Sequence, residues 1–332
     1  MSEVETLMNM NRRHLLAAAC ASLAAPAGLS VRADDKPLIR ILVGLPPGGG
    51  TDAIARVIAE RLPNELGQPV IVENKVGVGG RLAADALRVA APDGLTYMIA
   101  PNATPTFQTL VFASQIKWNL WRDFAPVAAL VSYPLGMAVS LQTGASNARE
   151  FVAWVKRNPS ASFGTPGLGG QNHFLGVQFA KAAGIDLPVT PYKGTPPLIT
   201  DLVGGHVPAA VTLMDEMLKF HRLGKVHVIG IFSDKRSELM PEIPTMAEQG
   251  IKVAGGEGWT AMWAPIKTPA AEIERMQRAL RRVLATPQVR DALIARLSVM
   301  PHYLNGQEMA QRQRSELALW EPVIKASGFK PE

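Results

Sequence analysis

The chain has 332 residues, with 34 lysines and arginines against 28 aspartates and glutamates, for a formal net charge of +6. A chain of this length forms roughly two domains of ordinary size or one large one, and it can bury a sizeable core. Because only 19% of the residues are charged and 47% are hydrophobic, global disorder is excluded. The excess of positive charge is small, and the sequence has no block of five or six like charges. We therefore expect no nucleic-acid binding.

Residues 1–33 are predicted to be an export signal. Arg12 and Arg13 precede an alanine-rich apolar run, and Val31 and Ala33 place small residues at positions −3 and −1 of a cleavage site. The apolar run is too short to span a bilayer well. The alternative to an export signal is an apolar helix that belongs to the core of the protein. The paired arginines leave both the Sec and the Tat routes open. We therefore expect a periplasmic protein.

The only cysteine of the chain, Cys20, lies inside this predicted signal. The mature chain would then contain no cysteine, which excludes disulfides, thiolate nucleophiles and cysteine metal sites. No other stretch of 18 or more apolar residues follows, so we expect the mature protein to be soluble.

Strand and helix patterns alternate in the first part of the mature chain. Continuous apolar runs indicate buried strands, and an apolar face that repeats every three to four residues indicates a helix ending near Gly67. The expected strands are Leu38–Leu45, Val70–Glu73 and Thr96–Ala100, and the expected helices are one that starts near Ala53 and ends near Gly67, and a second at Leu82–Ala91. This order predicts an α/β fold with an open parallel sheet.

The rest of the chain repeats the scheme. Further strands are expected at Ser162–Thr165, Val189–Tyr192, Val207–Leu213 and Val226–Phe232. Further helices are expected at Phe174–Ala183, Pro197–Val203, Asp215–Leu223, Ala270–Ala285, Gln288–Leu297 and Gln307–Ile324. We predict two lobes, one from residues 34–131 and 258–332 and the other from residues 132–257. Short strands near Val131–Tyr133 and Gly258–Trp263 are expected to connect them.

A glycine-rich segment, which we call loop 1 (residues 46–52), follows the first strand and opens a helix. A helix N-terminus presents unpaired N–H groups and a partial positive charge, and glycines let a ligand approach the backbone. Thr51 adds a hydroxyl, and Asp52 is suited to capping the helix or accepting from a ligand. The loop lacks the P-loop and dinucleotide patterns, and an ordinary strand–helix turn is the alternative. The candidate contacts are Pro46, Gly48, Gly49, Gly50, Thr51 and Asp52.

A second segment of this kind, loop 2 (residues 164–173), also joins a strand to a helix. Its candidate contacts are Gly164, Thr165, Gly167, Gly169, Gly170, Gln171, Asn172 and His173. We expect the two loops to face each other across a cleft and to clamp a carboxylate without any arginine. Other candidates that follow strands are Asn102, Tyr192, Lys193 and Asp215.

Metal and catalytic patterns are poor in this chain. The histidines of the mature chain form no His-x-x-x-His pair, and no Gly-x-Ser-x-Gly motif occurs. We therefore expect no metal, no cofactor and no enzymatic activity.

Several motifs, in order and at similar spacing, resemble those of the periplasmic solute-binding proteins of tripartite tricarboxylate transporters, the Bug family. The matching segments are Pro46–Gly49, Thr51–Asp52, Ala55–Arg56, Leu66–Val70, Val72–Lys75, Gly77, Gly79–Gly80, Ala91–Gly94, Phe124–Val127, Gly164–His173, Tyr192–Gly194 and Ile243–Thr245. The resemblance covers essentially the whole mature chain. The sequence departs from the commoner pattern at Asn102, at the third glycine Gly50, and at Met214 before Asp215.

This resemblance implies a two-lobed periplasmic-binding-protein fold of the Venus flytrap, type II-like kind, each lobe an open, mostly parallel sheet flanked by helices. It implies binding of a small organic carboxylate through loops 1 and 2, partly through ordered waters, and delivery to membrane subunits of a tripartite tricarboxylate transporter. It implies no catalysis, and we expect a monomer. The alternatives are a nucleotide-dependent Rossmann-like enzyme and a ligand-sensing binding protein for a signalling system.

Overall fold

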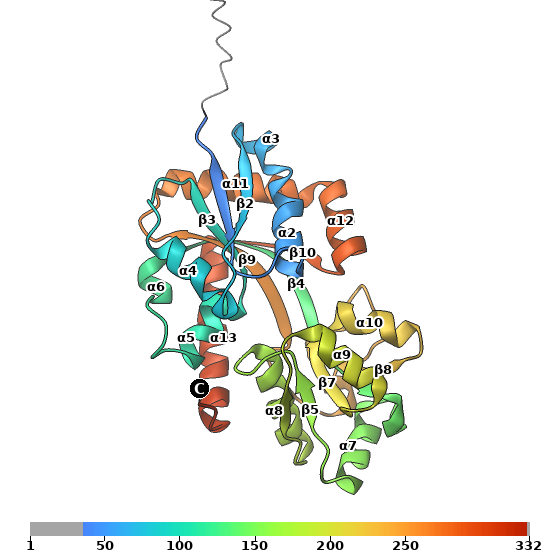
Figure 1. Cartoon of the computed structure of the whole chain (residues 1–332). Helices are drawn as coiled ribbons and strands as arrows, with labels where there is room; N and C mark the ends of the chain where they lie inside the picture. Colours follow the sequence, from blue (N-terminus) through green and yellow to red (C-terminus); the bar gives the residue numbers. More distant parts are fainter. Residues whose placement is uncertain (1–35, 331–332) are drawn as a thin grey trace, which may run out of the picture. The chain divides into compact units, whose positions relative to one another are not determined.

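The computed structural model describes residues 36–330, apart from the side chains of Asp215 and Glu216. The predicted export signal, residues 1–33, lies outside the described residues. From Pro37 onward the chain belongs to one compact unit, in which helices flank a single extended β-sheet (Figure 1). Within the described part of the chain, no helix is long and apolar enough to cross a membrane.

Three parallel strands form one end of the sheet. They are β1 (Ile39–Val43), β2 (Val70–Asn74) and β3 (Thr96–Pro101). β1 lies between the other two, with Ile39 opposite Val70 and Arg40 opposite Thr96. The intervening helices are α2 (Gly50–Ala59), α3 (Leu62–Leu66) and α4 (Arg81–Arg88). The single helix expected to end near Gly67 is thus two helices, and Pro63 lies in the first turn of the second, where proline is tolerated.

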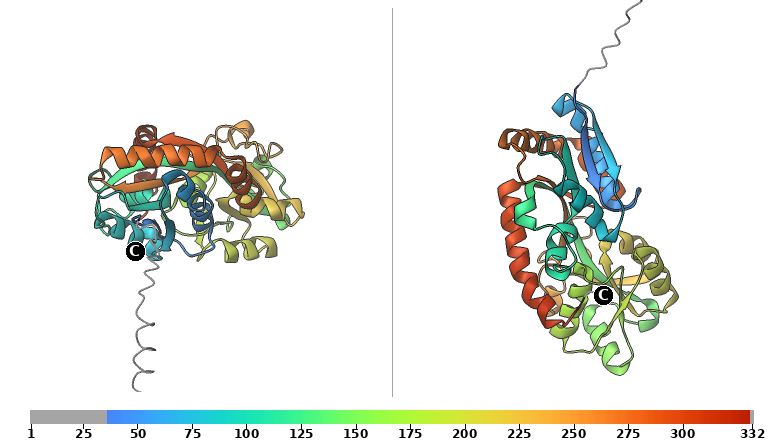
Figure 2. Two further views of the ribbon diagram at one scale, coloured as in Figure 1. Left: turned by 90° about the horizontal axis from the view of Figure 1, so that it is seen from above. Right: turned by 60° about the vertical axis from the view of Figure 1, so that its left-hand side comes forward.

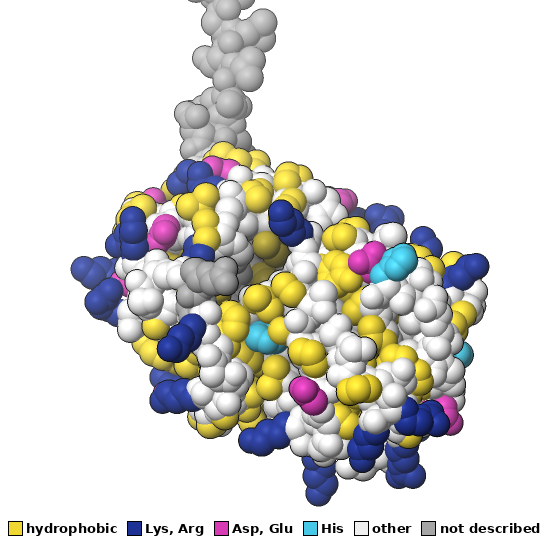
Figure 3. Space-filling view, turned by 60° about the horizontal axis from the view of Figure 1, so that its bottom comes forward, with side chains coloured by type: hydrophobic (Ala, Val, Ile, Leu, Met, Phe, Trp, Pro, Cys, Tyr) yellow, Lys and Arg dark blue, Asp and Glu magenta, His cyan; other side chains and the backbone are white. Residues whose placement is uncertain are grey.

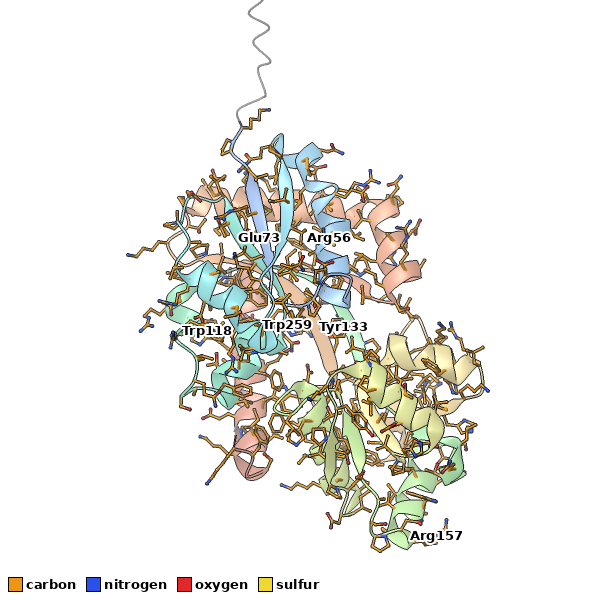
Figure 4. The ribbon with its side chains drawn as sticks, in the orientation of Figure 1. Arg56, Glu73, Trp118, Tyr133, Arg157 and Trp259 are labelled. Atoms are coloured by element: carbon orange, nitrogen blue, oxygen red, sulfur yellow. The ribbon has the colours of Figure 1, made fainter. Side chains whose placement is uncertain are left out.

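Two antiparallel strands run between the two ends of the sheet: β4 (Phe124–Ser140) and β9 (Glu257–Pro265). They pair from Phe124 opposite Pro265 to Pro134 opposite Glu257. Figure 4 shows Tyr133 on β4 and Trp259 on β9, close to the point where both strands pass from one group of elements to the other.

The middle of the chain forms the other end of the sheet. Its strands are β5 (Phe163–Thr165), β6 (Val189–Pro191), β7 (Ala209–Leu213) and β8 (Val226–Ile231). Its helices are α7 (Ala148–Arg157), α8 (Gln171–Ala183), α9 (Thr195–Gly204) and α10 (Met214–Arg222). We call these elements the second half, and β1–β3, β9 and β10 with their helices the first half.

The C-terminal part of the chain returns to the first half. It contains α11 (Ala270–Ala285), α12 (Pro287–Leu297), β10 (Met300–Asn305) and α13 (Gly306–Ala326). A capping box starts α13, because the Asn305 side chain accepts from the Glu308 N–H while Glu308 accepts from the Asn305 N–H. The short helices α5 (Gln108–Val111) and α6 (Leu120–Asp123) precede β4. α13, red in Figure 2, contacts β4, α5 and α8.

The strand order is β2-β1-β3-β9-β4-β7-β5-β6, and β8 and β10 both pair with β4. Among the named strands that the structure describes, parallel pairing joins β1 to β2 and β3, and β5 to β6 and β7. Every ladder that involves β4 or β9 is antiparallel, so the expected mostly parallel sheets are mixed sheets. The reason is that β4 is shared between the halves and pairs antiparallel with β9 and β10 of the first half and with β7 and β8 of the second half. The lobe boundaries at residues 131/132 and 257/258 stay a prediction.

Candidate functional site

All the predicted contacts lie just beyond the carboxyl ends of strands. Loop 1 follows β1, Asn102 follows β3, loop 2 begins in β5, Tyr192 follows β6, and Asp215 lies at the start of α10, after β7. In α/β sheets this edge is where ligands bind. The side chain of Asp215 lies outside what the structure describes.

Loop 1 leaves open space beside its backbone. Gly49 is the N-cap of α2 and has no side chain to accept a hydrogen bond from the helix. The first N–H groups of α2 therefore remain available as donors to a ligand. A Cβ atom added to Gly48 or Gly50 would meet no atom within 4 Å. Pro46 is exposed and Thr51 is half-buried beside them.

The Asp52 carboxylate stabilises loop 1 through hydrogen bonds within the protein. Its buried carboxylate accepts from the Gly48 N–H at 2.8 Å, from Arg56 Nε at 2.8 Å and from Asn74 Nδ2 at 2.8 Å. Burial opposes ionisation, but these hydrogen bonds and the Arg56 charge outweigh it and lower the pKa of Asp52. The sequence left two roles open for Asp52, helix capping and ligand contact. The geometry favours a structural role within the protein over ligand contact.

A third glycine loop, residues 77–80, packs against the base of loop 1. A Cβ on Gly44 would lie 2.5 Å from the Gly80 backbone, so the two segments can come this close only with a glycine at position 44. The carbonyl of Gly79 accepts from Gln108 Nε2 at 2.7 Å and from Thr104 Oγ1 at 3.2 Å. The run of glycines was visible in the sequence, but its partner Gln108 was not.

Loop 2 is tied to the segment that follows β6. The Thr165 carbonyl accepts from the Tyr192 N–H at 2.9 Å, and the Pro166 carbonyl accepts from the Gly194 N–H at 3.1 Å. The Thr165 hydroxyl, fully buried, donates to the Gly167 carbonyl at 3.3 Å. The structure therefore brings together two of the predicted groups of contacts.

His173 supports loop 2 as a neutral side chain. Burial lowers its pKa to about 4, and Nδ1 accepts from the Gly169 N–H at 3.3 Å, which leaves the proton on Nε2. Its ring packs against Phe174 and Phe329, with centroids 4.8 and 5.2 Å away. A neutral imidazole supplies no positive charge to a bound carboxylate.

Asn102 and Gln171, which are 69 positions apart, meet between the halves. Asn102 Nδ2 donates to Gln171 Oε1 at 3.3 Å and to Glu316 Oε2 at 3.2 Å, and both amides are buried. Gln171 Nε2 donates in turn to the carbonyls of Gly255 and Glu257. These two amides bridge the halves.

Glu316 is a buried partner of the predicted contact Asn102 that sequence reasoning missed. It accepts from Trp259 Nε1 at 2.6 Å and from Arg312 Nε at 3.2 Å. Burial raises the pKa of Glu316, against the lowering effect of Arg312, Trp259 and Asn102. The signal was its place on the apolar face of a helix, four residues before Trp320 and seven after Met309.

The remaining candidates are more peripheral. Lys193 is exposed and forms no ion pair with a described side chain. The Tyr192 hydroxyl donates to Asp201 Oδ2 at 2.8 Å. Asn172 is half-buried at the start of α8.

No hydrogen bond joins loop 1 to loop 2 among residues 36–330. Within the same residues, no group of three or more His, Cys, Asp or Glu could hold a metal ion.

A cavity of about 760 Å³ lies outside the predicted site. Its walls come from residues 132–134, 233–238, 254–257 and 300–302 and from α13, and none of the predicted contacts lines it. We place the candidate site at loops 1 and 2, because the open glycines and helix N-termini gather there. Figure 3 shows one face of the molecule, which is hollowed near its centre with hydrophobic side chains in the hollow.

Comparison with known proteins identifies the family of the chain. Residues 54–329 match the model of the tripartite tricarboxylate transporter family receptor. The chain is 32% identical to protein BugT of Bordetella pertussis over 97% of this chain and 99% of BugT. It is also 32% identical to a protein encoded in the gbd 5′ region of Cupriavidus necator, over 96% of this chain and 99% of that protein.

Solved structures show the same fold. A structure described as a periplasmic transporter is 30% identical, with a TM-score of 0.78 over 90% of this chain and 99% of its own. The periplasmic binding protein BugD is 27% identical, with a TM-score of 0.76 over 90% of this chain and 99% of BugD. MatC from Rhodopseudomonas palustris, solved with bound malate, is 27% identical, with a TM-score of 0.72 over 87% and 99%. The expected two-lobed periplasmic-binding-protein fold is confirmed.

Proposed function

The chain belongs to the tripartite tricarboxylate transporter receptor family, and from this premise we propose that it is a solute-binding protein that captures a small organic carboxylate between its two halves. Loops 1 and 2 would hold the ligand through backbone N–H groups at the starts of α2 and α8. A similar protein, MatC, has been solved with malate.

The observation that carries the proposal concerns three glycines. At Gly50, Gly167 and Gly170 the backbone φ is one that any residue adopts, and a Cβ would meet no atom within 4 Å. Among the described glycines, no other position combines both properties. Glycine costs conformational entropy on folding, so it is disfavoured where nothing requires it. All three lie in loops 1 and 2, and we infer that a ligand occupies the space that a side chain would fill.

The chemistry of the site suits binding rather than catalysis. His173 is neutral and buried, Asp52 is occupied by three donors, and Thr165 donates within its own loop. None of these groups is poised as a general base or nucleophile. We therefore propose that the protein is not an enzyme and needs no cofactor.

The remaining parts of the proposal concern location and delivery. The predicted signal at residues 1–33 would export the protein to the periplasm, where it would act as a monomer. The protein would then have two lobes that close on the ligand about β4 and β9. One lobe would consist of residues 34–131 and 258–332, and the other of residues 132–257. The closed form would deliver the carboxylate to the membrane subunits of a tripartite tricarboxylate transporter.

Thermal unfolding of residues 34–332 with added ligands tests the proposal. The panel contains malate and succinate, citrate, an aromatic acid, an amino acid, ATP and NAD. A ligand present at 100 times its Kd adds about 2.7 kcal/mol of stability. We expect a clear rise in Tm with at least one carboxylate and none with the nucleotides. A rise with ATP or NAD alone would contradict the proposal in favour of a nucleotide-dependent enzyme.

A further inference from the structure

The C-terminal helix α13 takes part in the cores of both halves. Met309, near its start, is buried in a cluster with Trp259 and Trp263 of the first half. Trp320 and Ile324, near its end, are buried in the cluster that forms the core of the second half. The helix is therefore a third connection between the halves, besides β4 and β9.

A polar path leads from α13 to the start of α8. The Glu316 carboxylate accepts from Asn102 Nδ2 at 3.2 Å, and the same amide donates to Gln171 Oε1 at 3.3 Å. Asn102 belongs to the first half and Gln171 is the first residue of α8, in the second half. Because Asn102 and Gln171 are buried, losing this contact would leave unpaired polar groups, which is costly.

The other side of Gln171 is held by the segment that enters β9. Its amide donates to the carbonyls of Gly255 and Glu257, and Arg312 donates to Glu257 Oε2 at 2.8 Å. A Cβ on Gly255 would lie 2.7 Å from the Trp320 ring. α13 therefore packs directly against the segment that fixes Gln171.

An apolar contact reinforces the polar one. Phe329, which follows α13, meets His173 and Phe174 edge-on, with ring centroids 5.2 and 5.9 Å away. A Cβ on Gly169 would lie 3.3 Å from Phe329 and 2.9 Å from Val111, so loop 2 lies against residues of the first half.

We propose that α13 and the residues after it form a clasp, with Glu316 as its polar contact and Phe329 as its apolar contact. The clasp holds loop 2 and the start of α8 against the first half. Opening of the halves about β4 and β9 would break the Asn102–Gln171 hydrogen bond and would draw one end of α13 out of the core in which it is buried. The proposed function gives the clasp its purpose, since a preformed loop 2 loses less entropy when a ligand binds.

Amide hydrogen exchange of the ligand-free protein tests the clasp without reference to any ligand. Local opening of α8 exposes its amides, so their exchange rates report the strength of the clasp. We expect Glu316→Ala and Phe329→Ala each to accelerate exchange by about tenfold at residues 174–180, whose N–H groups are hydrogen-bonded within α8. Amides of β1 serve as the internal reference and should be unaffected.

Two exposed neighbours provide matched controls. Glu321→Gln removes an ion pair with Lys325 from the same helix, and Lys330→Ala changes the residue next to Phe329. Neither control should alter exchange in α8. Unchanged exchange in either test variant, equal acceleration in the controls, or equal acceleration in β1 would overturn the clasp. Phe329→Ala keeps the test decisive if Glu316→Ala does not fold, and neither result depends on whether a carboxylate binds.

Discussion

Asn74 Nδ2 donates to Asp52 Oδ1 at 2.8 Å, which ties the end of β2 to the first turn of α2. The same amide donates to the Leu45 carbonyl at 3.1 Å. Loop 1 is thus fixed from both sides, at its start by Leu45 and at its end by Asp52. A loop held in this way presents its N–H groups in one arrangement before any ligand arrives, which favours tight binding.

Asp52→Asn is expected to weaken both folding and ligand binding. An asparagine amide would point an N–H group at one of the donors that Asp52 now accepts from, and a buried donor without an acceptor costs about 1–3 kcal/mol. We expect a loss of that size in urea unfolding and at least about tenfold weaker carboxylate binding in calorimetry. Arg56→Ala is the control and should cost under about 1 kcal/mol, because the Arg56 side chain is largely exposed. Unchanged affinity in Asp52→Asn would contradict an organising role for Asp52.

Gly50→Ala and Gly170→Ala separate ligand binding from stability. Both positions have an ordinary φ and open space, so an alanine should leave the free energy of unfolding within about 0.5 kcal/mol of the parent. Its methyl group would lie where we place the ligand, so affinity for the carboxylate should fall by more than about tenfold.

Gly184→Ala makes the same chemical change at the end of α8, where φ is +62°. There we expect the reverse pattern, a loss of roughly 1 kcal/mol in stability with unchanged affinity. If Gly50→Ala and Gly170→Ala bind as tightly as the parent, the ligand does not lie beside these loops.

The fold was predictable where local pattern decides structure. The apolar run of β1 and the 16-residue amphipathic pattern of α11 appear at the predicted places. The sequence predicted only a short strand near Val131–Tyr133, whereas the structure has the 17-residue strand β4, which includes Pro126 and Pro134 although proline is disfavoured inside strands. The structure accommodates Pro126 at a shift of register between β4 and β9, which local sequence does not reveal.

The sequence indicates the loops of the candidate site but not the partners of their side chains, and ligand binding at these loops stays a prediction. Glycines that follow strands identify loops 1 and 2, since the carboxyl ends of strands and helix N-termini carry a general physical preference for ligands. The pairing of Asn102 with Gln171 and Glu316 depends on contacts across 69 and 214 positions. Such contacts follow from the tertiary arrangement of the halves and leave no local signal in the sequence.

Thr165→Val tests whether the buried hydroxyl shapes loop 2. Valine keeps the shape of threonine and removes the hydrogen bond to the Gly167 carbonyl. We expect a stability loss of about 1 kcal/mol and weaker carboxylate binding, because the loop would lose its internal restraint. Thr190→Val removes a comparable hydroxyl bond, to Ser162 between β5 and β6, and should leave affinity unchanged. Equal affinities for both variants would remove Thr165 from the site.

The buried His173 predicts an acid-dependent loss of stability. Its pKa is about 4 in the folded protein against 6.5 for an unperturbed histidine, so the unfolded chain binds more protons between these values. The stability associated with neutral His173 is therefore complete above pH 6.5 and is lost as the pH falls toward 4. A shift of this size corresponds to about 3 kcal/mol.

Urea unfolding of the parent and of His173→Gln between pH 7 and pH 4 measures the stability that neutral His173 contributes. Glutamine keeps an acceptor for the Gly169 N–H but does not titrate, so the parent should lose about 3 kcal/mol more than the variant over this range. Asp52 does not interfere, because its own loss of stability, which sets in near its ordinary pKa of 3.8, is common to both proteins and cancels in their comparison. Parallel stability curves for the two proteins would mean that His173 is solvated and that loop 2 is not packed against Phe329 as described.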